Sequence, residues 1–197
     1  MSPSNTEPSE VLNFWLSEQN SQKWFVKDAD FDSEIRSKFG SLAVQARSTD
    51  LDDWTSTPEG TLALLILLDQ FSRNLHRGSR ESYAADAKAL GISIEAIAKG
   101  DELQMPLLSQ FIFYLPLVHN ESLVSQVAAK ALYEGYLRRC EASGNEKVIF
   151  IARAGLDACI KHLEVIRRFG RYPGRNDALG RVSTEEEKIF LRDEPQF

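Results

Sequence analysis

The chain has 197 residues, of which 43% are apolar and 26% are charged, and its formal net charge is -6. These values are typical of a soluble globular protein and argue against a disordered or membrane-embedded chain. A chain of this length buries about 70% of the surface that its unfolded form exposes, which is enough for a sizeable core. The negative charge gives no support to nonspecific binding of nucleic acid or of an anionic membrane.

The cysteines and the N-terminus indicate an intracellular protein. Cys140 and Cys159 form no CxxC pair, so we interpret them as reduced thiols. The first residues, MSPSNTEPSE, lack the basic start and apolar stretch of a signal peptide. We therefore expect a cytoplasmic protein with a disordered tail over residues 1–7. The longest apolar run, Leu62 to Leu68, is far shorter than the roughly 20 residues that span a bilayer.

Apolar residues recur at spacings of three and four along most of the chain, and alternating strand-like runs are nearly absent. The pattern predicts an all-α fold with one helical domain over residues 8–197, because no low-complexity linker divides it. We expect about eight helices, near residues 8–18, 31–48, 58–75, 79–99, 106–115, 121–142, 145–169 and 184–192.

Local signals support several of these boundaries. Thr57 followed by Pro58 is typical of a helix start, and Ser183 with Glu186 has the S-x-x-E spacing of a capping box. Glycines can end helices because they adopt the left-handed conformation without a steric penalty. Three glycines stand where predicted helices end, namely Gly78, Gly100 and Gly170.

Two helices carry most of the information about the core. Residues 62–68 are apolar on every side, which predicts a central helix surrounded by others. The helix over 145–169 is amphipathic, and we expect its apolar stripe to be buried. The aromatic patches at 14–16 and 24–25 are more typical of core packing than of a cofactor site.

The first polar cluster is DQFSRNLHRG, residues 69–78, directly after the buried run. Asp69 and Arg73 lie one helical turn apart, with Asn74 beside them and Arg77 one turn further on. A carboxylate next to an apolar segment needs a partner, because burying an unpaired charge is costly. A structural Asp69–Arg73 pair and a ligand-binding site are both compatible with this pattern.

The second cluster follows FIFYLPLVHNE, where we expect Pro116 to end or kink a helix. His119 could act as an acid or a base near neutral pH, with Glu121 in reach to orient it. The alternative is that Asn120 and Glu121 provide N-cap and first-turn chemistry for the next helix.

The third cluster runs from Lys161 to Arg181 and contains the segment FGRYPGRNDALGR, residues 169–181. We expect His162 at the edge of the core. The planar guanidinium group of arginine binds carboxylate or phosphate oxygens in pairs, so the segment is a candidate anion site. The alternative is that the arginines pair with acidic residues of the chain. The candidates are Arg167, Arg168, Arg171, Arg175, Arg181 and the neighbouring Asn176.

Other standard chemistry is not indicated. The glycines at 170, 174 and 180 match neither G-x-G-x-x-G nor G-x-x-x-x-G-K-[ST], and no strand precedes them. The sequence contains no H-E-x-x-H and no G-x-S-x-G, and its three histidines share no local metal spacing. We therefore predict no metal site and no cofactor, and we assign no catalytic residue.

Five stretches taken together resemble a known family: VLNFWL, WFVKDADFD, LLDQFSRN, FYLPLVHNE and FGRYPGRNDALGR with ST close behind. They are similar to domain-of-unknown-function family 924, from about Val11 to Phe190. The resemblance implies a compact, tetratricopeptide-repeat-like array of helices in antiparallel pairs. It supplies no established activity. The sequence departs from the family's usual pattern at Asn120, Gly174 and Ser72, so a role for a histidine at 174 is not expected.

Three functions remain open. The chain could bind a small polar or anionic ligand, or an acidic peptide, through ten candidate residues. It could be a protein- or peptide-binding scaffold whose polar clusters are structural salt bridges. It could be a hydrolase-type enzyme using His119 or His162 as acid or base. The ten candidate residues are Asp69, Arg73, Asn74, Arg77, His119, Glu121, His162, Arg171, Arg175 and Asn176.

Overall fold

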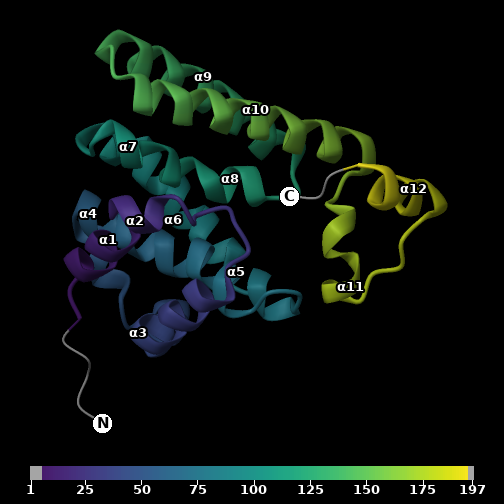
Figure 1. Cartoon of the computed structure of the whole chain (residues 1–197), viewed down its shortest axis with the longest axis horizontal. Helices are drawn as coiled ribbons and strands as arrows, with labels where there is room; N and C mark the ends of the chain where they lie inside the picture. Colours follow the sequence, from purple (N-terminus) through teal and green to yellow (C-terminus); the bar gives the residue numbers. More distant parts are fainter. Residues whose placement is uncertain (1–5, 195–197) are drawn as a thin grey trace. The chain divides into compact units, whose positions relative to one another are not determined.

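The computed structural model describes residues 6–194, and all regular structure in that range is helical (Figure 1). When each uninterrupted helical run that contains an α-helix is counted once, the described residues form ten helices rather than the expected eight. No helix in this range is long and apolar enough to cross a membrane. Residues 1–5 of the predicted disordered tail lie outside the described residues.

The chain divides into two compact units. Unit 1 comprises the residues up to Arg77 together with Glu81–Pro116, and unit 2 comprises Gly78–Arg80 and the residues from Leu117 onward. Each unit has its own packing, and the expectation of one domain over 8–197 stays a prediction.

Unit 1 contains the N-terminal helices, and most of its main elements agree with the predicted positions. The helix predicted over 79–99 begins only at residue 86, after a separate 3-10 turn. Helical turns of the 3-10 type connect several of the helices, at Asp52–Ser56, Arg80–Tyr83 and Asp101–Gln104. The α-helices are α1 (Pro8–Trp15), α2 (Glu18–Ser21), α3 (Ala29–Arg47), α4 (Pro58–Leu65), α5 (Ser72–Leu75), α6 (Asp86–Lys99) and α7 (Leu107–Gln110).

The core of unit 1 forms around the predicted central helix. Residues 62–68 are all fully buried, as expected. Between α4 and α5 the backbone winds as a π-helix over Ile66–Phe71, which the sequence did not predict. A cluster of stacked, tilted and edge-to-face rings includes Phe71 of this segment. Of the aromatic patches, Trp15 and Trp24 are buried, Phe14 is half-buried, and Phe25 is 72% exposed. The clustered rings are those of Phe14, Trp15, Phe31, Phe39 and Phe71.

The predicted helix start and stop signals are mostly confirmed. The Thr57 hydroxyl accepts a hydrogen bond from the Gly60 N–H at the start of α4. All three expected glycines have a positive φ, with values of 72°, 77° and 68° for Gly78, Gly100 and Gly170.

Two helix ends differ from the prediction. The capping box of the last helix uses Thr184 and Glu187, one residue after the predicted pair. Pro116 does not end its helix, because it stands in the first turn of α8 (Leu115–His119), where a missing N–H costs nothing. A 3-10 turn over Phe111–Tyr114 precedes it.

Unit 2 is built on two long helices that lie side by side (Figure 1), α9 (Leu123–Ser143) and α10 (Glu146–Phe169). Gly144 and Asn145 join them, and the Asn145 side chain caps α10. After α10 come a short 3-10 turn (Pro173–Arg175), α11 (Asn176–Leu179) and α12 (Glu185–Asp193).

Most of the predicted apolar stripe of α10 is buried, namely Val148, Ala152, Cys159 and Ile166, whereas its members Leu156 and Leu163 are half-buried. Where the two helices meet, a Cβ added at Gly155 would lie 2.7 Å from the ring of Tyr133. The absence of a side chain at this position therefore permits the close approach.

A pair of glycine substitutions tests the packing of unit 1. A Cβ at Gly60 would lie 2.2 Å from the Trp54 carbonyl oxygen, which is backbone and cannot rotate away. Gly60→Ala should therefore lower the free energy of unfolding by about 1–3 kcal/mol. Gly91→Ala, in α6 with no neighbour within 4 Å, is the control and should raise it by about 0.4–1 kcal/mol. Urea unfolding measures both, and equal effects would contradict this packing.

Candidate functional site

The ten predicted site residues fall into two groups. Asp69, Arg73, Asn74 and Arg77 belong to unit 1. The other six belong to unit 2, where they cluster around the chain that follows α10. A single pocket containing both groups stays a prediction, and each group is described within its own unit.

The unit 1 group makes polar contacts beside the π-helix, with Asp69 and Asn74 buried, Arg73 half-buried and Arg77 exposed. Asp69 is 2% exposed, and its carboxylate lies 3.5 Å from the Arg73 guanidinium. Arg73 also donates to Asp86 over 2.9 Å and contacts the Ser82 carbonyl. The predicted Asp69–Arg73 pair is thus present, and Asp86 shares the same guanidinium.

A residue that the sequence did not single out completes this network. The Asp32 carboxylate accepts hydrogen bonds from Asn74 Nδ2 over 2.7 Å and from Arg77 Nη2 over 2.9 Å. Burial tends to raise the pKa of Asp32, but these hydrogen bonds outweigh it and the pKa lies below its usual value. Asp32 comes from α3, more than forty residues away, so helical spacing around Asn74 could not have predicted it. These contacts are those of a structural clamp.

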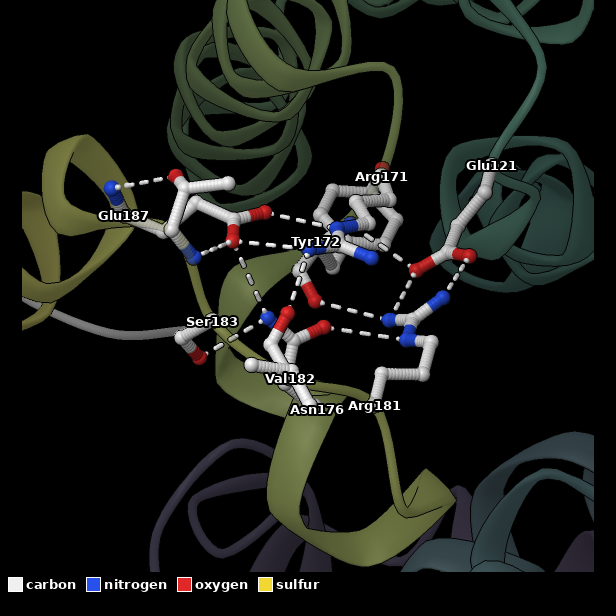
Figure 2. Close-up of polar contacts among 9 residues, drawn as sticks. Glu121, Arg171, Tyr172, Asn176, Arg181, Val182, Ser183 and Glu187 are labelled. Carbon is white, nitrogen blue, oxygen red and sulfur yellow. Dashed lines mark hydrogen bonds and ion pairs between the residues drawn. The ribbon is translucent and has the colours of Figure 1, made fainter.

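In unit 2 the Glu121 carboxylate holds the loop after α10 (Figure 2). It accepts the Tyr172 backbone N–H over 2.8 Å and two hydrogen bonds from Arg181, over 2.6 and 2.9 Å. Burial raises the pKa of a carboxyl group, but these hydrogen bonds outweigh it, so the pKa of Glu121 lies below its usual value. The Arg181 guanidinium also binds the Tyr172 carbonyl and the Asn176 side chain.

The N-cap interpretation of Asn120 and Glu121 is wrong. Helix α9 begins at Leu123 after Ser122, and no side chain caps it. Glu121 turns to the Arg181 guanidinium, because two charge-assisted hydrogen bonds are stronger than one capping bond. The Asn120 side chain accepts a hydrogen bond from Ser125.

A second carboxylate, that of Glu187 in α12, holds the other side of the loop (Figure 2). It accepts two hydrogen bonds from Arg171, over 2.6 and 2.8 Å, and one from the Thr184 N–H over 2.7 Å. Asn176 Nδ2 lies 3.4 Å away. The hydrogen bonds from Arg171 lower the pKa of Glu187 to about 2.

Two of the remaining predicted residues, His162 and Arg175, contact the ring of Tyr172, and His119 lies beside them. The Arg175 guanidinium lies 4.6 Å from the ring centre and donates to the His119 carbonyl over 2.8 Å. The His162 ring contacts Tyr172 edge to face at 5.5 Å, and the two histidine rings are 6.4 Å apart. We call the half-buried side chains of His119, His162 and Arg175 the basic corner.

The Tyr172 ring, on which the basic corner packs, is held by Gln126, a residue that the sequence did not single out. Gln126 of α9 is fully buried, and its Nε2 lies 2.7 Å from the Val118 carbonyl and 2.9 Å from the Tyr172 hydroxyl. Tyr172 in turn donates to the Val118 carbonyl. The sequence signal that could have identified Gln126 is a polar residue at a core position of a helix, because a buried polar group must find hydrogen-bond partners.

His162 stands at the core edge, as expected. Its Nδ1 lies 2.8 Å from the Ala158 carbonyl oxygen. Burial lowers the pKa of His162 to about 4, and the nearby charges of His119 and Arg175 act in the same direction. The imidazole is therefore neutral at pH 7.

The geometry of the described residues bears on metal binding and on cysteine chemistry. Within residues 6–194, no group of three or more His, Cys, Asp or Glu side chains is arranged to hold a metal ion. Burial raises the pKa of Cys159 to about 11, so this thiol does not ionise near neutrality and is a poor nucleophile. The basic corner instead offers hydrogen-bond donors and a neutral imidazole.

The fold and site define an all-helical protein in which two carboxylates secure a basic loop. The chain matches the family described as "Bacterial protein of unknown function (DUF924)" over residues 11–195, and it belongs to that family. A solved structure of a protein of unknown function from Agrobacterium tumefaciens is 32% identical. The match covers 95% of this chain and 97% of that chain, with a TM-score of 0.79. No curated protein matches the chain.

Removing the partner of Glu121 tests the loop anchor. Arg181→Met leaves a half-buried carboxylate without its guanidinium, so the melting temperature should fall by about 5 °C or more. The control is Arg167→Gln, which breaks an exposed ion pair with Glu164 and should have little effect. Equal melting temperatures for the two variants, measured by calorimetry, would show that Glu121 does not anchor the loop.

The low pKa of His162 predicts a specific loss of stability in acid. Between pH 6.5 and about 4 the unfolded chain binds a proton at this side chain that the folded protein does not bind. The free energy of unfolding should therefore fall as the pH drops through this range, by about 3 kcal/mol at most from this residue. His162→Asn should make the dependence shallower, as followed by urea unfolding at several pH values. An unchanged slope would mean that His162 titrates normally.

Proposed function

We propose that the chain binds a small carboxylate or phosphate anion at the basic corner. The observation that carries the proposal is that three nitrogen-bearing side chains from three separate segments lie close together: His162 and Arg175 contact the ring of Tyr172, and the His119 ring lies next to that of His162. His119 ends α8, His162 lies in α10, and Arg175 follows α10. A perturbed histidine within a cluster of basic groups is typical of a functional site.

The salt bridges reduce the set of predicted ligand-binding residues. Arg171 is bound by Glu187 and Arg181 by Glu121, each through two hydrogen bonds. These arginines are therefore assigned to the framework that positions Tyr172 and Arg175. Asn176 supports the same framework through Arg181 and Glu187. For these residues the proposal therefore adopts the structural role that the scaffold hypothesis gave to the polar clusters.

Arg175 suits the proposed role because of its geometry. Its guanidinium is stacked on an aromatic ring, so little side-chain entropy is lost when further hydrogen bonds form. A planar guanidinium presents its N–H donors in a fixed fork, and Arg175 donates from this group to the His119 carbonyl. Carboxylates and phosphates present the paired oxygens that match this donor group.

A second candidate function is a protein- or peptide-binding scaffold, with helices in tetratricopeptide-like antiparallel pairs. It is favoured by apolar side chains exposed in the first turns of α9, where Val124 is 80% and Val127 57% exposed. The hydrolase alternative, with His119 or His162 as acid or base, is less well supported, since burial disfavours the protonated His162 that a general acid requires. A cytoplasmic location is expected for all three.

The test is titration calorimetry with inorganic phosphate and with succinate. Arg175→Met should weaken binding at least about tenfold, because charge-assisted hydrogen bonds are lost. Arg175→Lys, which keeps the charge without the planar fork, should have an intermediate effect. The matched control is Arg167→Met at the exposed face of α10, which should bind like the wild type.

Two outcomes would overturn the proposal. One is that the wild-type protein binds neither anion, and the other is that Arg175→Met binds as well as the control. Circular dichroism and the melting temperature of each variant separate loss of binding from loss of folding.

A further inference from the structure

The face of α10 opposite its buried stripe combines an exposed aromatic ring with small side chains and charges. Phe150 is 73% exposed in this face, and the side chains of Ala154 and Ala158 are exposed on the same side of the helix. Asp157 and Lys161 lie between and beside them, one helical turn apart. The small residues allow a second helix to approach closely, and the ring offers apolar area that such a helix would bury.

The two charges in the middle of this face are not used within the chain. Acidic and basic residues at this spacing commonly pair within one helix, as Lys130 and Glu134 do in α9. Within residues 6–194, however, Asp157 and Lys161 form no ion pair. The next carboxylate along the helix, that of Glu164, is already bound to Arg167 over 2.7 Å. Asp157 and Lys161 are therefore the charges of this face that a partner can meet.

The order of these charges makes the face complementary to a second copy of itself. In two helices that pack antiparallel about a two-fold axis, residues face each other when they are equally distant from the centre of the pairing. With the centre midway between Asp157 and Lys161, each copy's carboxylate faces the other copy's ammonium group. The same register places Phe150 opposite Arg168, whose guanidinium already lies 4.7 Å from the centre of the Phe169 ring. The ring can therefore join an existing arginine–aromatic group.

We propose that this face of α10 is an interface through which two copies of the chain associate, antiparallel, with two reciprocal Asp157–Lys161 contacts. The ring of Phe150 supplies apolar area to bury, and the charges fix the direction and register of the pairing. A parallel pairing in register would oppose like charges. One pair of helices buries less area than a standard interface, so association is weak and depends on concentration. No side chain of the basic corner takes part, so the inference does not depend on the proposed function.

The experiment is sedimentation equilibrium of the full chain from about 10 to about 500 µM, a range suited to a weak interface. We expect the mean mass of the wild type to rise from monomer toward dimer. Phe150→Ser should weaken association at least about tenfold, because the buried apolar area is lost. The matched control is Phe25→Ser in unit 1, where a ring that is 72% exposed is removed and association should stay as in the wild type.

Exchange of the charges tests the register. Asp157→Lys and Lys161→Asp each oppose like charges across the two-fold axis, so each should weaken association at least about tenfold. The double variant Asp157→Lys/Lys161→Asp restores opposite charges at both contacts. An equimolar mixture of the two single variants restores them as well, in a dimer of unlike chains. Both should associate within about threefold of the wild type.

Three outcomes would overturn the inference. The first is a wild type that stays monomeric at every concentration. The second is a Phe150→Ser chain that associates as well as Phe25→Ser, which would place the interface elsewhere. The third is single charge variants that associate like the wild type, or a mixture of them that does not recover. All four substituted side chains are exposed, and circular dichroism checks that each variant keeps its helices. If one variant does not fold, the wild type and the remaining variants still decide the matter.

Discussion

The carboxylate of Glu121 is the constraint on which the arrangement of unit 2 depends. It lies at the connection between α8 and α9, and it binds both the backbone of Tyr172 and the guanidinium of Arg181. One side chain therefore fixes the start and the end of the irregular segment between α10 and α12. The position of Tyr172 follows from this anchor, and the ring of Tyr172 in turn orients Arg175 and His162.

The loop after α10 shows how a basic segment can be ordered without a regular ladder of hydrogen bonds. Glu121 and Glu187 hold its two sides through Arg181 and Arg171, and the backbone of Tyr172 is used as donor and acceptor. Half-buried ion pairs contribute modest net stability, but losing one partner is costly. Such pairs therefore specify one loop conformation more than they raise the total stability. That conformation keeps the basic corner assembled.

The sequence was sufficient to predict most of the helices and the buried core. Periodicity located the helix over residues 58–75, but it did not reveal the π-helical winding at Asp69, which depends on packing around the segment. Spacing along one helix predicted the Asp69–Arg73 pair because both partners are local. It could not decide whether Glu121 orients His119, supplies first-turn chemistry for the next helix or pairs with one of the distant arginines. That choice joins segments 60 residues apart in the chain and is made by tertiary structure.

The chemistry of the candidate site depends on the protonation of one ring. The contact of His162 Nδ1 with the Ala158 carbonyl oxygen requires a proton on Nδ1, and burial favours the neutral ring. Nitrogen-15 NMR of histidine side chains in the full chain at pH 7 measures this directly. Our account predicts that Nδ1 of His162 is protonated and that Nε2 is not. A proton on Nε2, or an imidazolium ion at pH 7, would contradict it.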